Sequence, residues 1–179
     1  MQQMVALLLL TVVPVININC RARGYFFARW SVGGAVHAAL PGRVSLIACP
    51  EKSADFQGHH GFQVILVNRT NATVGLEAQD FRINIVREAR DMAGRWRPIE
   101  YLSQSWCGLS YHRVYLRPGR HWSFPAPVYS GPFRTQMRFV LDQPGLHLVS
   151  NEFSGTINVQ QFEKRQGHTP ANIMDPYDD

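Results

Sequence analysis

The sequence predicts an all-β protein, an antiparallel β-sandwich formed by one domain. From Arg43 to Phe162 the chain consists of short runs rich in Val, Ile, Phe, Tyr and Trp. Gly, Pro, Asn and Asp separate these runs at intervals of about ten residues, a rhythm that is typical of sandwiches and barrels. Between Trp30 and Phe162 no stretch repeats apolar residues at the three-and-four spacing that an amphipathic helix requires. We therefore expect little helix.

The sequence patterns of two predicted strands indicate which of their faces are buried. Residues 62–67 are apolar at every position except Gln63, as in a strand that is covered on both faces near the middle of a sheet. Residues 133–141 alternate instead, with Arg134, Gln136 and Arg138 on the face opposite the apolar side chains, so one face meets water. The remaining predicted strands are residues 44–49, 74–78, 81–87, 95–101, 111–116, 121–125, 146–150 and 155–160.

Turn-forming residues mark how these strands connect. The polar run 68–72 predicts a hairpin after the central strand. In residues 117–120, Pro118 presets one backbone dihedral and Gly119 supplies a positive one, which predicts a tight reversal. Pro125 and Pro127 lack the amide hydrogens that a central strand needs, so this region is expected to be a sheet edge or a strand exit.

The N-terminus resembles an export signal. Residues 4–16 are apolar apart from Thr11 and are too short for a spanning helix, and Cys20 and Ala22 have the spacing of a cleavage site. We expect residues 1–22 to be a signal peptide, residues 23–162 the sandwich domain and residues 163–179 a disordered tail. Export to the periplasm or the cell exterior follows. Because basic residues follow the apolar run instead of preceding it, a retained membrane anchor is the alternative.

Cleavage after Ala22 leaves two cysteines, Cys49 and Cys107. An even number in an oxidising compartment is compatible with one disulfide, which we predict. The alternative is a pair of buried thiols that only pack.

Composition and charge exclude some classes of function. The chain has 45% hydrophobic and 17% charged residues, as a globular protein does. Its net charge of +5 is the balance of 18 Lys and Arg residues against 13 Asp and Glu residues, and the basic residues are spread along the sequence. A nucleic-acid reader would show a concentrated basic stripe with a recognisable motif, so no nucleic-acid partner is expected.

Catalytic and metal sites are not expected. Cys107 and His112 lie close in sequence and define one enzymatic alternative, a hydrolase or redox enzyme, but no third group that would orient the base is evident. His59 and His60, read as loop residues, and His112 and His121 lack metal-binding spacing. We predict no catalytic residue, metal or cofactor.

Two surfaces are candidates for binding an unknown protein or glycan partner. The first combines Arg134 and Arg138 with Arg113 and Arg117 from a strand expected to lie nearby, and would suit an acidic partner. The second is aromatic, with Trp106 and Trp122 among its residues. For both surfaces the alternative is core packing with a solvated outer face.

Two sequons, at Asn68 and Asn71, match the N-glycosylation pattern. Asn and Thr also form the backbone hydrogen bonds that such a turn needs. Whether either asparagine carries a glycan stays open at this point.

Residues 62–68, an apolar strand ending in Asn, together with the Leu116-Arg-Pro-Gly119 turn, resemble the plan of small bacterial immunoglobulin-like modules. The chain is distantly similar to the proteinase-inhibitor type of these modules. This resemblance implies an immunoglobulin-like sandwich in an exported bacterial protein, and it maps no inhibitory loop onto particular residues. We expect a non-enzymatic binding or accessory module, with a protease-inhibitor-like module as an alternative.

Overall fold

The computed structural model describes residues 39–79, 82–100 and 111–163. Within these ranges the chain forms β-strands and one short 3-10 helix, η2, and the expected all-β class is confirmed. The elements are β1 (Val44–Phe56), β2 (His59–Asn68), β3 (Val74–Gln79), β4 (Arg82–Ile83), β5 (Ile85–Arg90), β6 (Trp96–Pro98), β7 (Tyr111–Leu116), β8 (His121–Pro127), β9 (Phe133–Gln143), β10 (Leu146–Val149), β11 (Phe153–Ile157) and η2 (Val159–Glu163).

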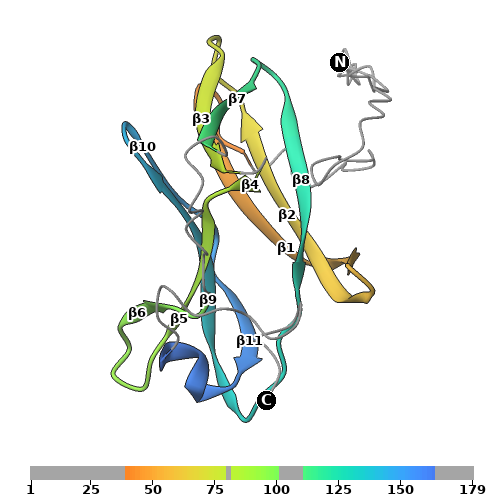
Figure 1. The fold of residues 1–179 in the computed structure, drawn as a ribbon, viewed down its shortest axis with the longest axis vertical. Helices are drawn as coiled ribbons and strands as arrows, with labels where there is room; N and C mark the ends of the chain where they lie inside the picture. Colours follow the sequence, from red (N-terminus) through yellow and green to blue (C-terminus); the bar gives the residue numbers. More distant parts are fainter. Residues whose placement is uncertain (1–38, 80–81, 101–110, 164–179) are drawn as a thin grey trace, which may run out of the picture.

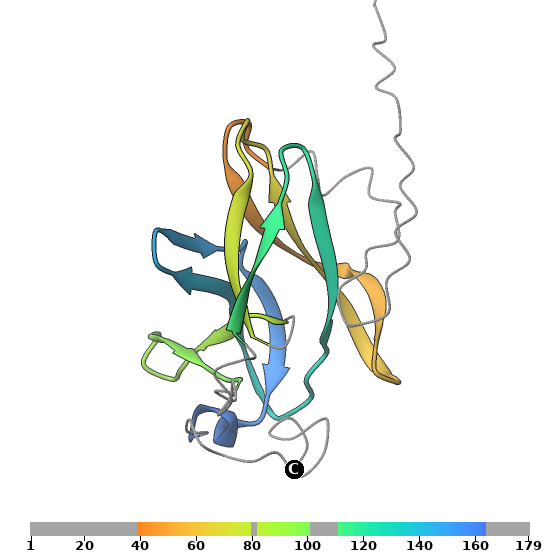
Figure 2. The same cartoon turned by 45° about the horizontal axis from the view of Figure 1, so that its top comes forward.

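The strands form three antiparallel sheets. One has the order β1-β2-β8, the second has the order β10-β9-β5-β6 with β11 also paired to β9, and the third has the order β4-β3-β7. The chain leaves the first sheet after β2, enters the third as β3, and returns from β7 to β8. The turns that make these two passages lie together at one end of the molecule, at the top of Figure 1 and of the turned view in Figure 2.

One apolar core joins the three sheets. It includes Leu66 of β2, Leu76 of β3, Leu116 of β7 and Leu141 of β9, all buried. The opposite face of β1 and β2 carries a second, smaller cluster of Ala39, Cys49, Ile65 and Val67. Both faces of β2 are therefore covered, and this strand lies between β1 and β8, as its nearly continuous apolar sequence predicts.

The edge prediction for the proline-containing strand also agrees with the structure. Among the described residues β8 pairs only with β2, so it lies at the edge of its sheet, and Pro125 is exposed there. In β9 the expected alternation is present, with Met137, Phe139 and Leu141 buried. Arg134 on the other face is exposed.

The β1–β2 hairpin is longer than predicted. Its turn is formed by Gln57 and Gly58, both with positive φ (53° and 89°), which suits the twist of a two-residue hairpin. His59 and His60 belong to β2, so their assignment to a loop is wrong. The sequence misled because His and Gly are poor strand formers, whereas pairing with β1 holds these residues extended.

Three other predicted boundaries differ from the structure. The strand expected over residues 81–87 is divided into β4 and β5 at Asn84, and the one expected over residues 95–101 is reduced to β6. The last predicted strand starts earlier, at Phe153, and ends at Ile157, where η2 follows. The predicted tail begins within η2 at Glu163, and the rest of it lies outside the described residues.

Asn68 ties the two crossing turns together. It is fully buried at the end of β2, and its side-chain amide donates to the carbonyl oxygens of Ala72 (2.8 Å) and Leu116 (2.9 Å). Its main-chain amide donates to Arg120 (2.9 Å), and its carbonyl accepts from Gly119 (2.9 Å). The predicted 117–120 reversal is present, with a positive φ at Gly119.

This arrangement bears on the two sequons. The side-chain nitrogen of Asn68 has no route to solvent, because both of its hydrogens are donated to the protein and the residue is buried. A glycan on this nitrogen is incompatible with the fold. Asn71 is exposed in the same turn, and its glycosylation remains an untested alternative.

Candidate functional site: the open edge of β1

Strand β1 has one free edge. Among the described residues it pairs with β2 alone and forms the end of its sheet. Three extra residues, 50–52, bulge out between the Cys49–Gln63 pair and the Ser53–Phe62 pair, which interrupts the ladder. Pro50 at the bulge suits such an interruption because it lacks an amide hydrogen. The regular part of the free edge is therefore the segment from Val44 to Cys49.

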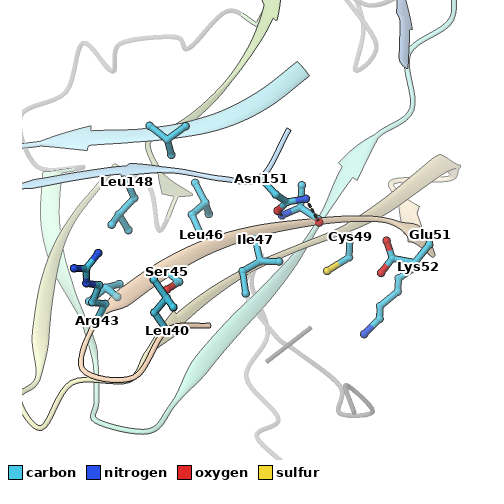
Figure 3. A pocket seen from close by; sticks show the side chains of 13 residues that line it. Leu40, Arg43, Ser45, Leu46, Ile47, Cys49, Glu51, Lys52, Leu148 and Asn151 are labelled. Carbon is cyan, nitrogen blue, oxygen red and sulfur yellow. Dashed lines mark hydrogen bonds between the residues drawn. The ribbon is translucent and has the colours of Figure 1, made fainter. Parts of the chain in front are cut away.

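Asn151 already occupies one position on this edge. Its side-chain oxygen accepts from the Ala48 amide (2.9 Å), and its side-chain nitrogen donates to the Ala48 carbonyl (3.0 Å). The carboxamide thus makes the same two hydrogen bonds that a peptide group of a neighbouring strand would make. Figure 3 shows Asn151 beside the strand in this position.

The hydrogen bonds between Asn151 and Ala48 also establish which way the neighbouring main-chain groups of β1 point. Hydrogen-bonding groups of an antiparallel strand alternate from residue to residue between its two sides. Since those of Ala48 face away from β2, the amides and carbonyls of Val44 and Leu46 face the same open side. No other described strand pairs with them.

A groove of about 700 Å³ runs along this edge. Leu46 of β1 and Leu148 and Val149 of β10 give it apolar walls, and Figure 3 shows Leu46 next to Leu148. Val149 is 40% exposed. Among the described strands β10 is also the end of its sheet, so the groove lies where two sheets each present an edge that no described strand pairs with.

Charged residues lie only at the two ends of the groove. Arg43 lies at one end, and Glu51 and Lys52 of the bulge lie at the other, as Figure 3 shows. The middle, from Val44 to Cys49, contains no charged side chain. The surface therefore combines main-chain hydrogen-bonding groups that no described strand pairs with and apolar contact area.

Cys49 lines the inner part of the groove. It is buried, and burial, together with the nearby Glu51 carboxylate, raises the pKa of its thiol. A thiol held protonated in this way is a poor nucleophile. Cys49 forms no disulfide with a described residue. Cys107 lies outside the described residues, so the predicted bridge remains a prediction.

The predicted arginine surface is divided between two sheets. Arg113 lies on β7 and Arg117 follows it, whereas Arg134 and Arg138 lie on β9. Strand β7 pairs with β3, and the neighbours of β9 are β5, β10 and β11. The structure therefore does not place β7 beside β9, which the combined surface requires. Long-range pairing of this kind is not visible in the local sequence pattern.

Two of these arginines have partners within the protein. Arg138 lies 2.8 Å from Glu88 and stacks 4.3 Å from the ring of Trp96. Arg113 lies 3.9 Å from Glu77 on the paired strand, and both side chains are largely exposed. The Arg113–Glu77 pair is an exposed cross-strand ion pair, as expected for the solvated outer face named above as the alternative.

The aromatic surface is described only in part. Trp122 is half-buried on β8 and packs against the core, which agrees with the core-packing alternative for this residue. Trp106 lies outside the described residues.

The histidines form no metal site among the described residues, where no group of three or more His, Cys, Asp or Glu side chains converges. His121 begins β8 and is buried, and burial lowers its pKa. His112 lies on β7. Its proposed catalytic partner, Cys107, lies outside the described residues.

Sequence reasoning missed the groove. The sequence around Asn151 indicated this role only weakly, because a single Asn after a strand usually forms a turn. The free edge of β1 gave none, because strand order depends on residues far apart in the chain.

Comparisons of the chain with protein-family models, with curated proteins and with solved structures gave no match. In the described part of the chain no helix has the length and apolar character to cross a membrane.

Proposed function

We propose that this protein is a non-enzymatic binding module that takes an extended segment of a partner protein as an added strand in the groove along β1. The observation that carries the proposal is the open edge at Val44 and Leu46, beside a position where Asn151 imitates a strand. Addition of a strand to a sheet edge is a recurring mode of peptide recognition.

The chemistry of the groove favours an extended peptide over other occupants. Outward amides and carbonyls alternate along β1 with the repeat of a β-strand, and a peptide is the ligand with matching groups at that repeat. From Val44 to Ile47, next to the position that Asn151 fills, the edge spans about 10 Å, at roughly 3.3 Å per residue. It would hold about four residues, with apolar side chains toward Leu46 and Leu148 and polar ones toward solvent.

The finer fold assignment forms part of the proposal. An immunoglobulin-like sandwich is supported by the pairing of β2 with β8 in one sheet and of β5, β9 and β10 in another. This is the arrangement of the B–E and C–F–G pairings in such folds. Binding at an edge strand of this scaffold fits an accessory role in the periplasm or outside the cell, which the signal-like N-terminus supports.

Selection of peptides from a random seven-residue library on the immobilised protein tests the proposal. We expect enriched peptides with alternating apolar residues and no proline in the paired segment. N-methylation should then be scanned along one enriched peptide. Methyl groups on alternate amides, those facing β1, should each raise the Kd about tenfold, since each removes a hydrogen bond of roughly 1–1.5 kcal/mol. Methyl groups on the intervening amides should have little effect.

A matched pair of protein variants tests whether the peptide binds in the groove along β1. Val149→Asp puts a charge on the wall of the groove, and Val159→Asp puts the same charge on η2 at similar exposure (40% and 38%). The first should abolish binding and the second should leave the Kd unchanged. Equal effects of the two variants, or an N-methyl scan without alternation, would refute strand addition at β1.

A further inference from the structure

A second cavity lies beside the buried side chain of Arg87. It has a volume of about 330 Å³, within the range of small-molecule sites. Phe62 of β2, Met137 of β9 and Phe153 of β11 contribute to its walls. It shares no lining residue with the groove along β1.

Arg87 is held rigidly at this cavity. Its side chain is fully buried, its Nε lies 3.2 Å from Glu100, and its Nη1 donates to the Pro127 carbonyl (2.8 Å). The guanidinium also stacks on the rings of Tyr129 (4.1 Å) and Phe139 (4.8 Å). A guanidinium fixed in this way is positioned before any ligand arrives.

Two nitrogens of this guanidinium make no hydrogen bond. Nη2 and Nε of Arg87 are buried and have no hydrogen-bond partner in the described part of the protein, although Nε forms an ion pair with Glu100. Buried polar groups almost always have a partner, and a charged donor without one is costly. An acceptor that enters the cavity would remove this cost.

The other charges at the cavity specify the sign of that acceptor. Arg134 and His60 line it and are exposed, and no Asp or Glu among the described residues lines it. Arg134 has no ion pair with a described residue. Glu100 already balances the charge of Arg87, so Arg134 supplies most of the attraction for an anion, and Arg87 supplies a directed donor.

We infer that this cavity binds a small organic carboxylate with an aromatic or branched apolar body. The carboxylate would lie between Arg87 and Arg134, because planar guanidinium groups pair well with carboxylates. The apolar body would contact Phe62, Met137 and Phe153. The volume suits a ligand of about ten non-hydrogen atoms.

Titration with benzoate, followed by two-dimensional NMR of the full-length protein, tests this inference. We expect a Kd of roughly millimolar strength, as for a ligand of this size. The resonances of Gly155 and of the Arg87 Nε–H group should shift. Benzamide, which has the same shape without the charge, should bind at least about tenfold more weakly.

Arg134→Gln and Arg117→Gln form the matched variants. Both arginines are exposed, and only Arg134 lines the cavity. Arg134→Gln should raise the Kd for benzoate about tenfold, and Arg117→Gln should not change it. Arg87 is kept, because its replacement would disturb the core. The inference would be overturned by equal affinity for benzoate and benzamide, or by equal effects of the two variants. It would also be overturned if the Gly155 resonance did not shift at the highest benzoate concentration that the sample tolerates. None of these results would bear on the β1 groove.

Discussion

Replacing Asn68 by Ala tests how the two crossing turns are held. The substitution removes both side-chain donations, to Leu116 and to Ala72, and the acceptor for the Thr70 amide (2.9 Å). The Leu116 bond is fully buried, so its loss leaves a carbonyl without a partner, at a cost of about 1–3 kcal/mol. The other two bonds are partly buried and contribute about 0.5–1.5 kcal/mol each. Together the loss in the free energy of unfolding should be about 2–6 kcal/mol.

Urea denaturation measures this loss directly, and Tm should fall by roughly 5–25 °C for a domain of this size. Asn71→Ala, in the exposed part of the same turn, is the control and should change stability by less than about 0.5 kcal/mol. Asn68→Asp retains an acceptor for Thr70 but loses both donors and buries a charge, so it should be at least as destabilising as Asn68→Ala. A loss below about 1 kcal/mol for Asn68→Ala would refute the role assigned to this side chain.

Three further predictions follow from burial and packing. Burial lowers the pKa of His121. The stability that the neutral, buried imidazole contributes is therefore complete above the ordinary pKa of 6.5 and is lost as the pH falls through the lower pKa of the folded state. His121→Gln should flatten the dependence of the unfolding free energy on pH below 6.5. A Cβ at Gly131 would lie 2.2 Å from the main chain of Ile157, so Gly131→Ala should cost about 2–4 kcal/mol by thermal unfolding, whereas Gly75→Ala, with only an ordinary contact at 3.4 Å, should cost less than about 1 kcal/mol. Cys49 of the reduced native protein should react with iodoacetamide at least about 100-fold more slowly than in urea, and equal rates would contradict its burial in the groove.

Local pattern was sufficient to predict most strands. The spacing of apolar residues in 62–67 and 133–141 is enough to predict which side chains are buried. The backbone dihedrals that Pro118 and Gly119 favour are enough to predict the turn that contains them. These features depend on neighbours in the sequence, so a single chain reveals them.

The candidate sites depend on pairing between distant segments, which local pattern does not contain. Arg87 looks like any solvated arginine between strands, but the fold buries it among Phe62, Tyr129 and Phe139, whose rings come from distant parts of the chain. Asn151 lies 103 residues from Ala48, the residue that it pairs with. The expected neighbourhood of Arg113 and Arg117 with Arg134 and Arg138 is not formed for the same reason, because β7 pairs with β3 and not with β9.

The central claim is that the outer edge of β1 accepts a strand, and amide hydrogen exchange measured residue by residue tests it most directly. In the free protein the Val44 and Leu46 amides, which face the open side, should exchange faster than those of Ser45 and Ile47, which face β2. A saturating peptide from the library selection should slow Val44 and Leu46 and leave Ser45 and Ile47 nearly unchanged. Exchange at Val44 and Leu46 that the bound peptide does not slow would contradict strand addition at this edge.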